Sequence, residues 1–411
     1  MKILIIHQYF LQKHDGGGSR FNEMTRIWAN EGHEITVISG MIHANAAHKY
    51  KEYQGKFFYF EDHFENVRVL RCHVSEAYNV NFIGRLWAYF SFVVSSTLGF
   101  FLKVNTNYDV VLVSSPPLFI GITGLIISKI KKIPLVFEVR DLWPESAIDI
   151  GVLKSRWIAR LAFWFEKVLY NNSAFINVLT PAFKKILIQQ KFISPDKILE
   201  ISNAVDFRLS DQVLKTLDQH KLRKQLNWQD KFVLIYVGAH GLANNLDQII
   251  AVAQLVKNTN AHFILIGDGM EKKRLKEKAK HLNNIEFWDP IEKEKIFELI
   301  ASADAGLTVF KKAEVFKTIY ANKTFDYMGC RLPVLMVLEG ISKELIEASK
   351  SGLYVRQGDK YDFAEKINWL IANPIEAKEM GKNGYLYAKQ HFDRDVLAKQ
   401  YLEKLKTLKT A

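Results

Sequence analysis

The stretch FVLIYVGAHGLANNLDQIIAVAQLVKNTNAHFILIGDG, residues 232–269, decides the fold class. It opens with an apolar run, Phe232–Val237, and closes with another, His262–Ile266, and each run is followed directly by glycine. Between them, apolar residues recur at helical spacing from about Asn245 onward. A strand, a helix and a second strand of these lengths form a βαβ unit, whose strands lie parallel in one sheet. The stretch therefore predicts an α/β protein.

The same alternation of strand and helix extends in both directions from this stretch. Before it, the expected strands are Lys2–Ile6, Glu34–Ile38, Val67–Arg71, Val110–Ser114, Leu135–Glu138 and Phe175–Leu179. After it, they are Ile285–Phe287, Gly306–Val309, Pro333–Met336 and Leu353–Val355. The clearest helices are Arg20–Asn30, Trp157–Tyr170 and Arg394–Thr407.

One polar stretch interrupts the alternation and marks a domain boundary. Residues 203–230 contain no strand pattern and suggest a linker and a charged helix. We therefore predict two doubly wound domains, residues 1–204 and 205–392, followed by a terminal helix in 393–411. A chain of 411 residues is long enough for two such domains.

The charge and cysteine content narrow the class of protein. The chain has 56 basic and 44 acidic residues, a formal net charge of +12, which favours phosphate-rich partners. Its basic residues are scattered and form no nucleic-acid motif, so we expect no nucleic-acid partner. Two cysteines make neither a disulfide framework nor a zinc site. The opening apolar run MKILII is too short for a secretory signal, which predicts a cytoplasmic protein.

An uncharged stretch, Leu86–Leu102, is just long enough to cross a bilayer as a helix. The segments on either side of it are predicted strands of one parallel sheet, and a span would place them on opposite sides of the membrane. We therefore expect a buried or membrane-surface helix. With the positive net charge, this predicts peripheral association with the anionic inner face of the cytoplasmic membrane.

Two candidate ligand loops lie in the first half. Glycines at 16–18, including Gly17 and Gly18, precede a helix, where backbone N–H groups suit an anion. Arg140, Asp141 and Glu145 follow an apolar strand, and such loops bind ligands in open α/β sheets. A carboxylate beside an arginine there suits proton transfer or sugar hydroxyls. The alternatives are a simple surface loop and a salt-bridged loop.

Two further candidates lie in the second half. Gly238 ends one strand and Gly267 and Gly269 end the next, which together suggest a nucleotide-phosphate cleft. Lys317 and Lys323 stand near the start of a helix that carries Asp326 in its expected first turn. Lysines at a helix start suit a diphosphate. The alternative is that Asp326 only favours the helix dipole and both lysines are solvated.

These segments together resemble the retaining GT-B glycosyltransferases of family four. The resemblance covers nearly the whole chain and rests on HQYF…GGGSRF, RDLWPES, NAVD, YVG, IGDG and FK…NK.FDYMG, in that order. Within the family, the chain is most similar to bacterial N-acetylfucosamine transferases of surface-polysaccharide synthesis (the WbuB-like branch). The resemblance implies two facing Rossmann-like domains, an active site in the cleft between them, and a last helix that returns to the N-terminal domain.

The resemblance also implies roles for particular residues. Gly17 and Gly18 would lie near the donor phosphates and the acceptor, and Asp326 would hold the donor ribose. Gly267 and Gly269 would line the nucleotide cleft.

The sequence departs from the wider family at several of these positions. Ala239 and Asn244 replace the usual arginine and lysine, and Thr318 replaces a glutamate that contacts the donor sugar. We expect Lys317 and Lys323 to supply the missing cations. Arg140-Asp141 stands where the family commonly has His-Asp.

The function implied is transfer of a sugar from a UDP-sugar, with retention, to a lipid-linked or oligosaccharide acceptor. The sugar is expected to be an N-acetylated amino sugar such as N-acetylfucosamine, and the product a bacterial O-antigen or capsule. We expect Arg140, Asp141, Lys317 and Lys323 to serve catalysis by stabilising the leaving diphosphate or the acceptor, without metal or cofactor. The alternatives are a nucleotide-sugar epimerase or hydrolase on the same fold and a non-catalytic nucleotide-sugar-binding scaffold. An NAD-linked dehydrogenase is disfavoured because GxGxxG is absent.

Overall fold

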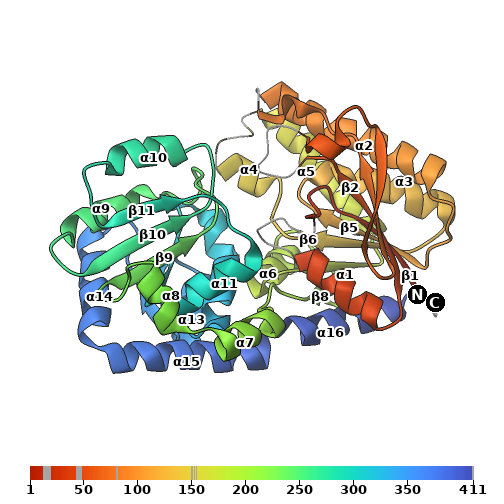
Figure 1. Cartoon of the computed structure of the whole chain (residues 1–411). Helices are drawn as coiled ribbons and strands as arrows, with labels where there is room; N and C mark the ends of the chain where they lie inside the picture. Colours follow the sequence, from red (N-terminus) through yellow and green to blue (C-terminus); the bar gives the residue numbers. More distant parts are fainter. Residues whose placement is uncertain are drawn as a thin grey trace. The chain divides into compact units, whose positions relative to one another are not determined.

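The computed structural model of the chain describes residues 1–12, 20–42, 49–79, 82–149, 151, 153 and 155–409. It resolves into two compact units, each built around its own sheet (Figure 1). The first unit comprises residues 1–12, 20–202 and 395–409, and the second comprises Asn203–Arg394.

The first unit contains an eight-stranded sheet in the order β3-β4-β2-β1-β5-β6-β7-β8. The strands are β1 (Lys2–Ile6), β2 (Glu34–Gly40), β3 (Phe58–Phe64), β4 (Val67–Cys72), β5 (Val110–Ser115), β6 (Leu135–Val139), β7 (Phe175–Val178) and β8 (Ile198–Glu200). Every pair is parallel except β3 with β4, which is antiparallel. The strand order reverses between β1 and β5, and such a reversal positions a ligand at the carboxyl ends of the strands.

The described part of this unit contains seven helices, of which the last, α16, begins one residue before the chain returns to the unit. They are α1 (Arg20–Asn30), α2 (Phe82–Lys103), α3 (Gly121–Lys131), α4 (Glu145–Asp149), α5 (Arg156–Asn172), α6 (Pro181–Gln189) and α16 (Arg394–Lys406), with short 3₁₀ turns at η1 (Lys51–Tyr53), η2 (Glu76–Asn79), η3 (Leu118–Ile120) and η4 (Pro195–Lys197).

Helix α2 connects β4 to β5 and packs on the sheet they share. Within the described residues it contains the one helical stretch, Leu86–Lys103, that has the length and hydropathy of a membrane span. Its inner face buries Phe92 and Phe100, and the Ser96 hydroxyl lies 2.9 Å from that of Thr123 on α3. Because β4 and β5 are parallel strands of one sheet, the connection between them must run back along a face of that sheet, and α2 packs there.

The last helix, α16, completes the core of the first unit. Tyr401, Leu402 and Leu405 are fully buried there among residues from the sheet and α1. The Trp28 indole N–H donates to the Ala398 carbonyl at 2.8 Å, and the Trp28 and Tyr401 rings meet edge to face. The predicted return of the terminal helix to the N-terminal domain is therefore confirmed.

The second unit contains a six-stranded, fully parallel sheet in the order β11-β10-β9-β12-β13-β14. Its strands are β9 (Phe232–Val237), β10 (Ala261–Ile266), β11 (Ile285–Trp288), β12 (Ala305–Val309), β13 (Val334–Val337) and β14 (Gly352–Tyr354). The order reverses between β9 and β12, so the loops after β9, β10 and β12 are the expected ligand loops.

Helices flank this sheet and bury its apolar strands in two clusters. They are α7 (Phe207–Thr216), α8 (Gln219–Gln225), α9 (Asp247–Leu255), α10 (Lys272–Ala279), α11 (Lys293–Ser302), α12 (Asn322–Gly329), α13 (Ile341–Ala348), α14 (Lys360–Ala372) and α15 (Pro374–His391), with a 3₁₀ turn η5 (Glu314–Thr318). The polar stretch 203–230 thus carries α7 and α8. Two doubly wound, Rossmann-like units confirm the predicted fold class.

Candidate active site

Two glycine turns meet at the carboxyl ends of β9 and β10. Gly238, Gly267 and Gly269 have φ of 150°, 148° and 156°, a backbone region that favours glycine. A Cβ atom on Gly267 would lie 1.9 Å from the Gly238 carbonyl oxygen. The turns are also hydrogen-bonded, since His240 N donates to the Asp268 carbonyl at 2.8 Å. The three glycines predicted to line a cleft therefore form one backbone platform at the reversal of strand order.

Lys323, on α12, lies against this platform. Its ammonium is 4.2 Å from the centroid of the Tyr236 ring and 5.2 Å from that of Phe310. A Cβ atom on Gly238 would lie 3.2 Å from the Lys323 Nζ. Burial lowers the pKa of Lys323 to about 7, and nearby Asp326 opposes that shift. The structure thus brings together Gly238, Gly267, Gly269 and Lys323 from the predicted site.

Helix α12 is held in place by buried hydroxyl groups. The Tyr327 hydroxyl accepts a hydrogen bond from Val237 N at 3.1 Å and donates to the Leu307 carbonyl at 3.2 Å. Asp326 is half-buried on the same helix. The expectation that Asp326 stands in the first turn is wrong, because α12 begins at Asn322 and its first turn has no acid. The helix-dipole role therefore does not apply to Asp326, and its role in holding the donor ribose stays a prediction.

Lys317 has a different environment from Lys323. Its ammonium lies 2.7 Å from a Glu314 carboxylate oxygen and 3.5 Å from one of Glu339. The hydrogen bond to Glu314 is the main reason that the pKa of Lys317 is raised. Its charge is therefore already balanced by carboxylates, whereas the Lys323 ammonium lies over aromatic rings.

Sequence reasoning missed two residues in the glycine platform. His240 is fully buried, and neither of its ring nitrogens has a hydrogen-bond partner among the described residues. Burial lowers its pKa to about 4, so the ring is neutral at physiological pH. Lys272 donates from Nζ to the Gly267 carbonyl at 2.7 Å and to Asp289 at 2.6 Å, which fixes the turn after β10. Both residues lie within three positions of a glycine that was predicted to line the cleft, and this proximity could have identified them as site residues.

Arg140 and Asp141 stand at the carboxyl end of β6 in the first unit. Arg140 lies 2.6 Å from the Nε2 atom of His7, which directly follows β1. Burial lowers the pKa of His7 well below its ordinary value, and the Arg140 charge lowers it further. Asp141 accepts a hydrogen bond from the Ser146 hydroxyl at 2.7 Å, and burial raises its pKa. This cluster lies beside the first unit's reversal of strand order. It also contains His7, which was not among the predicted site residues.

Glu145 belongs to a neighbouring ion-pair cluster. It begins α4, and its Oε1 atom lies 2.5 Å from the Lys191 ammonium, which also lies 2.5 Å from Glu166. Its second oxygen is buried without a partner within the described residues. Burial raises the pKa of Glu166 to about 7. Glu145 is thus paired with the half-buried Lys191, and a role in sugar binding remains a prediction.

Gly17 and Gly18, predicted to lie near donor phosphates, fall outside the described residues. Within the described part of the chain, no three His, Cys, Asp or Glu side chains are grouped to hold a metal ion.

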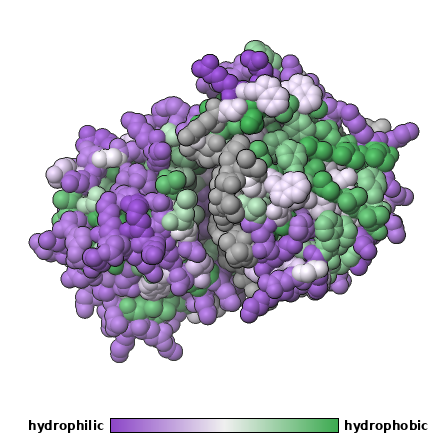
Figure 2. Space-filling model, turned by 90° about the horizontal axis from the view of Figure 1, so that it is seen from above, coloured by the Kyte–Doolittle hydropathy of each residue, from purple (hydrophilic) through white to green (hydrophobic). Residues whose placement is uncertain are grey.

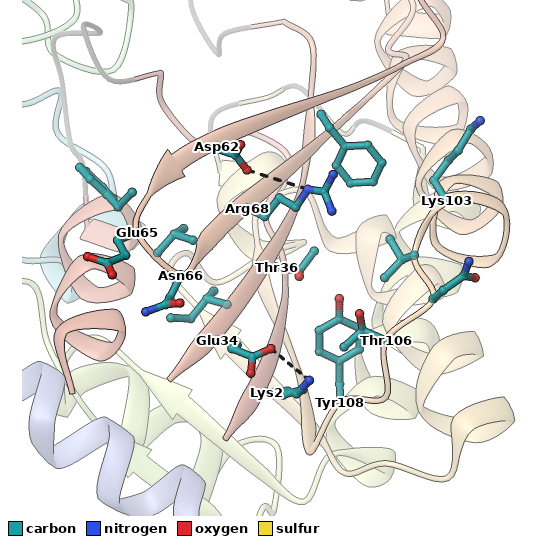
Figure 3. Close-up of a pocket in the computed structure, with 16 residues that line it drawn as sticks. Lys2, Glu34, Thr36, Asp62, Glu65, Asn66, Arg68, Lys103, Thr106 and Tyr108 are labelled. Atoms are coloured by element: carbon teal, nitrogen blue, oxygen red, sulfur yellow. Dashed lines mark ion pairs between the residues drawn. The ribbon is translucent and has the colours of Figure 1, made fainter. Parts of the chain in front are cut away.

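A pocket of about 650 Å³ lies at the opposite edge of the first unit's sheet, by the amino ends of β1, β2 and β4 (Figure 3). Lys2 pairs with Glu34 at 3.1 Å, and Arg68 lies 4.0 Å from Asp62. Because its main charges are paired and it lies away from the carboxyl ends, we do not assign the active site here.

Comparisons with known proteins match most of the chain. A family model described as "Glycosyl transferase 4-like domain" matches residues 15–204, and one described as "Glycosyl transferases group 1" matches residues 218–387. The chain is 23% identical over 326 residues to WcaI of Escherichia coli (strain K12), assigned as a glycosyl transferase of colanic acid biosynthesis. This match covers 76% of the chain and 77% of that protein.

Solved structures of similar fold span nearly the whole chain. HepE of Anabaena, solved in complex with UDP, is 20% identical with a TM-score of 0.71, covering 99% of this chain and 100% of HepE. WaaG, a glycosyltransferase of lipopolysaccharide biosynthesis, is 15% identical with a TM-score of 0.71, covering 98% of this chain and 99% of WaaG. The predicted GT-B fold is confirmed.

Proposed function

The chain belongs to the group 1 glycosyltransferases of the GT-B fold, and on that premise we propose that it transfers a sugar from a UDP-sugar. The proposal is supported most by one observation, the Lys323 ammonium against the Gly238–Gly267 platform at the reversal of strand order. A diphosphate needs a cation and close backbone approach, and this arrangement offers both. HepE, which shares the fold, was solved with UDP bound.

In this proposal, the second unit binds the donor and the departing UDP is the group to be stabilised. Charge develops on the diphosphate as the bond to the sugar breaks, and preorganised cations and dipoles lower that barrier. Lys323 supplies the cation, and Asp326, one turn further along α12, holds the ribose. Lys317 is the second candidate for the outer phosphate, although two carboxylates already pair with it. No metal or cofactor is part of the proposed mechanism.

The first unit serves the acceptor in this proposal. Arg140 and Asp141 lie at its ligand edge, and a carboxylate with a raised pKa can accept or share a hydroxyl proton. The configuration of the sugar is retained, with the leaving phosphate helping to deprotonate the acceptor.

We further propose an N-acetylated amino sugar, such as N-acetylfucosamine, as the group transferred. The resemblance to the WbuB-like branch supports this choice. The acceptor is lipid-linked and is used at the inner face of the cytoplasmic membrane for a surface polysaccharide such as O-antigen or capsule. The names of WcaI and WaaG, which refer to surface glycans, are consistent with this proposal.

The test combines UDP affinity with turnover of a panel of UDP-sugars. Lys323→Ala is expected to lower turnover by about 100-fold, as loss of a transition-state charge contact does elsewhere. Lys317→Ala and Arg140→Ala are measured beside it. Full activity in Lys323→Ala, with loss only in Arg140→Ala, would contradict the phosphate assignment. Conversion of a UDP-sugar without any acceptor would instead indicate an epimerase or hydrolase, and UDP-sugar binding without turnover would indicate a scaffold protein.

A further inference from the structure

Helices α2 and α5 expose an unusual number of large apolar side chains. Trp87, Trp157 and Trp164 have 61%, 71% and 61% of their surface exposed. Further exposed apolar residues follow on both helices: Phe90, Val94, Leu98, Phe101 and Leu102 on α2, and Leu161 and Phe163 on α5. Hydrophobic side chains gather over the first unit in Figure 2. Soluble proteins seldom expose contiguous apolar patches of this kind without a partner.

The exposed faces of α2 and α5 flank one loop. The ring of Phe119, in η3, lies 5.0 Å from that of Phe90 on α2 and 6.3 Å from that of Phe165 on α5. Helix α3 also packs against both helices. We call these exposed side chains of the two helices the α2–α5 surface. Phe119 and Phe165 are themselves buried, so the two exposed faces lie on either side of one aromatic cluster in the first unit.

The exposed charged side chains of α2, α3 and α5 are all basic. Neither α2 nor α3 contains an acidic residue, and the one acid of α5, Glu166, is buried and paired with Lys191. Exposed Arg156, Arg160 and Lys167 on α5 have no carboxylate partner in the described part of the chain. The surface therefore combines tryptophans, aliphatic side chains and unpaired cations without an exposed carboxylate on these helices.

We propose that the α2–α5 surface docks on an anionic lipid bilayer. Tryptophan favours the boundary between headgroups and acyl chains, and cations beside it meet lipid phosphates. The other face of α2 is packed on the sheet, so the helix has one free face, as an interfacial helix does. The inference deepens the proposed function and rests on it for the acceptor, which a bilayer would hold.

The docking surface connects to the acceptor loop of the first unit. The same buried Phe119 ring also lies 5.4 Å from the ring of Trp143. Trp143 is two residues beyond Asp141, in the loop after β6. Docking through α2 and α5 would therefore bring the Arg140–Asp141 loop to the side of the protein that meets the bilayer.

The test is flotation of the full chain with vesicles of phosphatidylcholine, alone or mixed with phosphatidylglycerol. We expect binding to the mixed vesicles, weakened by salt. The double variants Trp157→Ser/Trp164→Ser and Arg156→Glu/Arg160→Glu should each lower it at least about tenfold. Matched controls on the second unit are Trp369→Ser on α14 and Lys273→Glu/Lys276→Glu on α10, which alter exposed residues of the same types and should bind as the wild type does.

Two further measurements separate docking from folding and catalysis. UDP affinity and turnover with a water-soluble acceptor should be unchanged in the α5 variants, whereas turnover with a lipid-linked acceptor in vesicles should fall. Equal binding to both kinds of vesicle, or no effect of the α5 variants, would overturn the proposal. Loss of self-association in those variants, without vesicle binding by the wild type, would overturn it in favour of a second copy. Absence of UDP binding in the wild type would refute the proposed function but leave the flotation result standing.

Discussion

The environment of Lys323 predicts that UDP binding weakens as pH rises above neutrality. Burial lowers the pKa of Lys323 to about 7, so the free protein holds this lysine only half charged at that pH. A bound diphosphate favours the charged form and raises the pKa again. Binding at higher pH therefore requires uptake of a proton, and the affinity falls as protons become scarce.

The size of the effect follows from the fraction of Lys323 that is charged. With a pKa of about 7, that fraction is about one half at pH 7 and about one hundredth at pH 9. If the bound lysine stays charged over this range, the association constant for UDP falls about 50-fold, or about 2.3 kcal/mol. Neighbouring His240, with a pKa of about 4, stays neutral throughout. Burial raises the pKa of Tyr236 well above its ordinary value, so it does not ionise either.

Isothermal titration calorimetry with UDP, at intervals from about pH 7 to about pH 9, measures this decline. Buffers that differ in ionisation enthalpy report the proton uptake directly. In Lys323→Arg the guanidinium stays charged, so the profile should flatten. Lys317→Ala is the control and should keep the wild-type slope, because the pKa of Lys317 is raised and not lowered. A flat profile in the wild type, or the same slope in Lys323→Arg, would refute the reasoning.

Three other predictions concern the second unit's site and the first unit's buried acid. Asp326→Ala should weaken UDP binding about tenfold, more than any change in the first unit, and unchanged affinity would exclude the ribose assignment. Gly267→Ala, whose Cβ would meet the Gly238 carbonyl at 1.9 Å, should lower the melting temperature and UDP affinity in scanning calorimetry and titration; Gly241→Ala, at an open position, should change neither. Glu166 has a pKa raised to about 7, so the folded protein binds more protons than the unfolded chain from about pH 4.5 to 7. Thermal stability should fall over that interval in the wild type and stay flatter in Glu166→Gln.

The buried parallel strands could be predicted well from the sequence. Lys2–Ile6 and Phe232–Val237 coincide with β1 and β9, because a strand covered on both faces is an uninterrupted apolar run. Strand β3, with the sequence FYFEDHF, was missed because it is an antiparallel edge strand that carries charges on a half-exposed surface. Strand β8 was missed because its sequence, ILE, has only two apolar residues before a glutamate and follows the polar turn Pro195–Lys197.

Only those features of the site that depend on neighbouring residues in the sequence could be predicted. Glycine directly after a buried strand identified Gly238 and Gly267, since chain direction alone places such turns at the carboxyl edge. Contacts between side chains that are far apart in the sequence could not be predicted from short motifs. Arg140 meets His7 across 133 positions of the chain. Glu145 in α4 meets Lys191, and three further elements, α5, β7 and α6, lie between them in the chain. The order of the strands in the folded sheet determines which charged side chains meet, and short motifs do not reveal that order.

The path of the chain makes the second unit an insertion within the first. The chain leaves the first unit after Ser202 and returns at Asp395. At this junction Val205 N donates to the Phe392 carbonyl at 2.8 Å, and Arg394 N donates to the Val205 carbonyl at 3.0 Å. The outgoing and returning segments are therefore neighbours joined by a parallel bridge. Replacement of the second unit by that of a relative therefore needs two cuts in the chain, and both cuts fall at this one junction. A short linker from residue 202 to residue 395 would leave the first unit's sheet, α16 and the α2–α5 surface on one continuous chain.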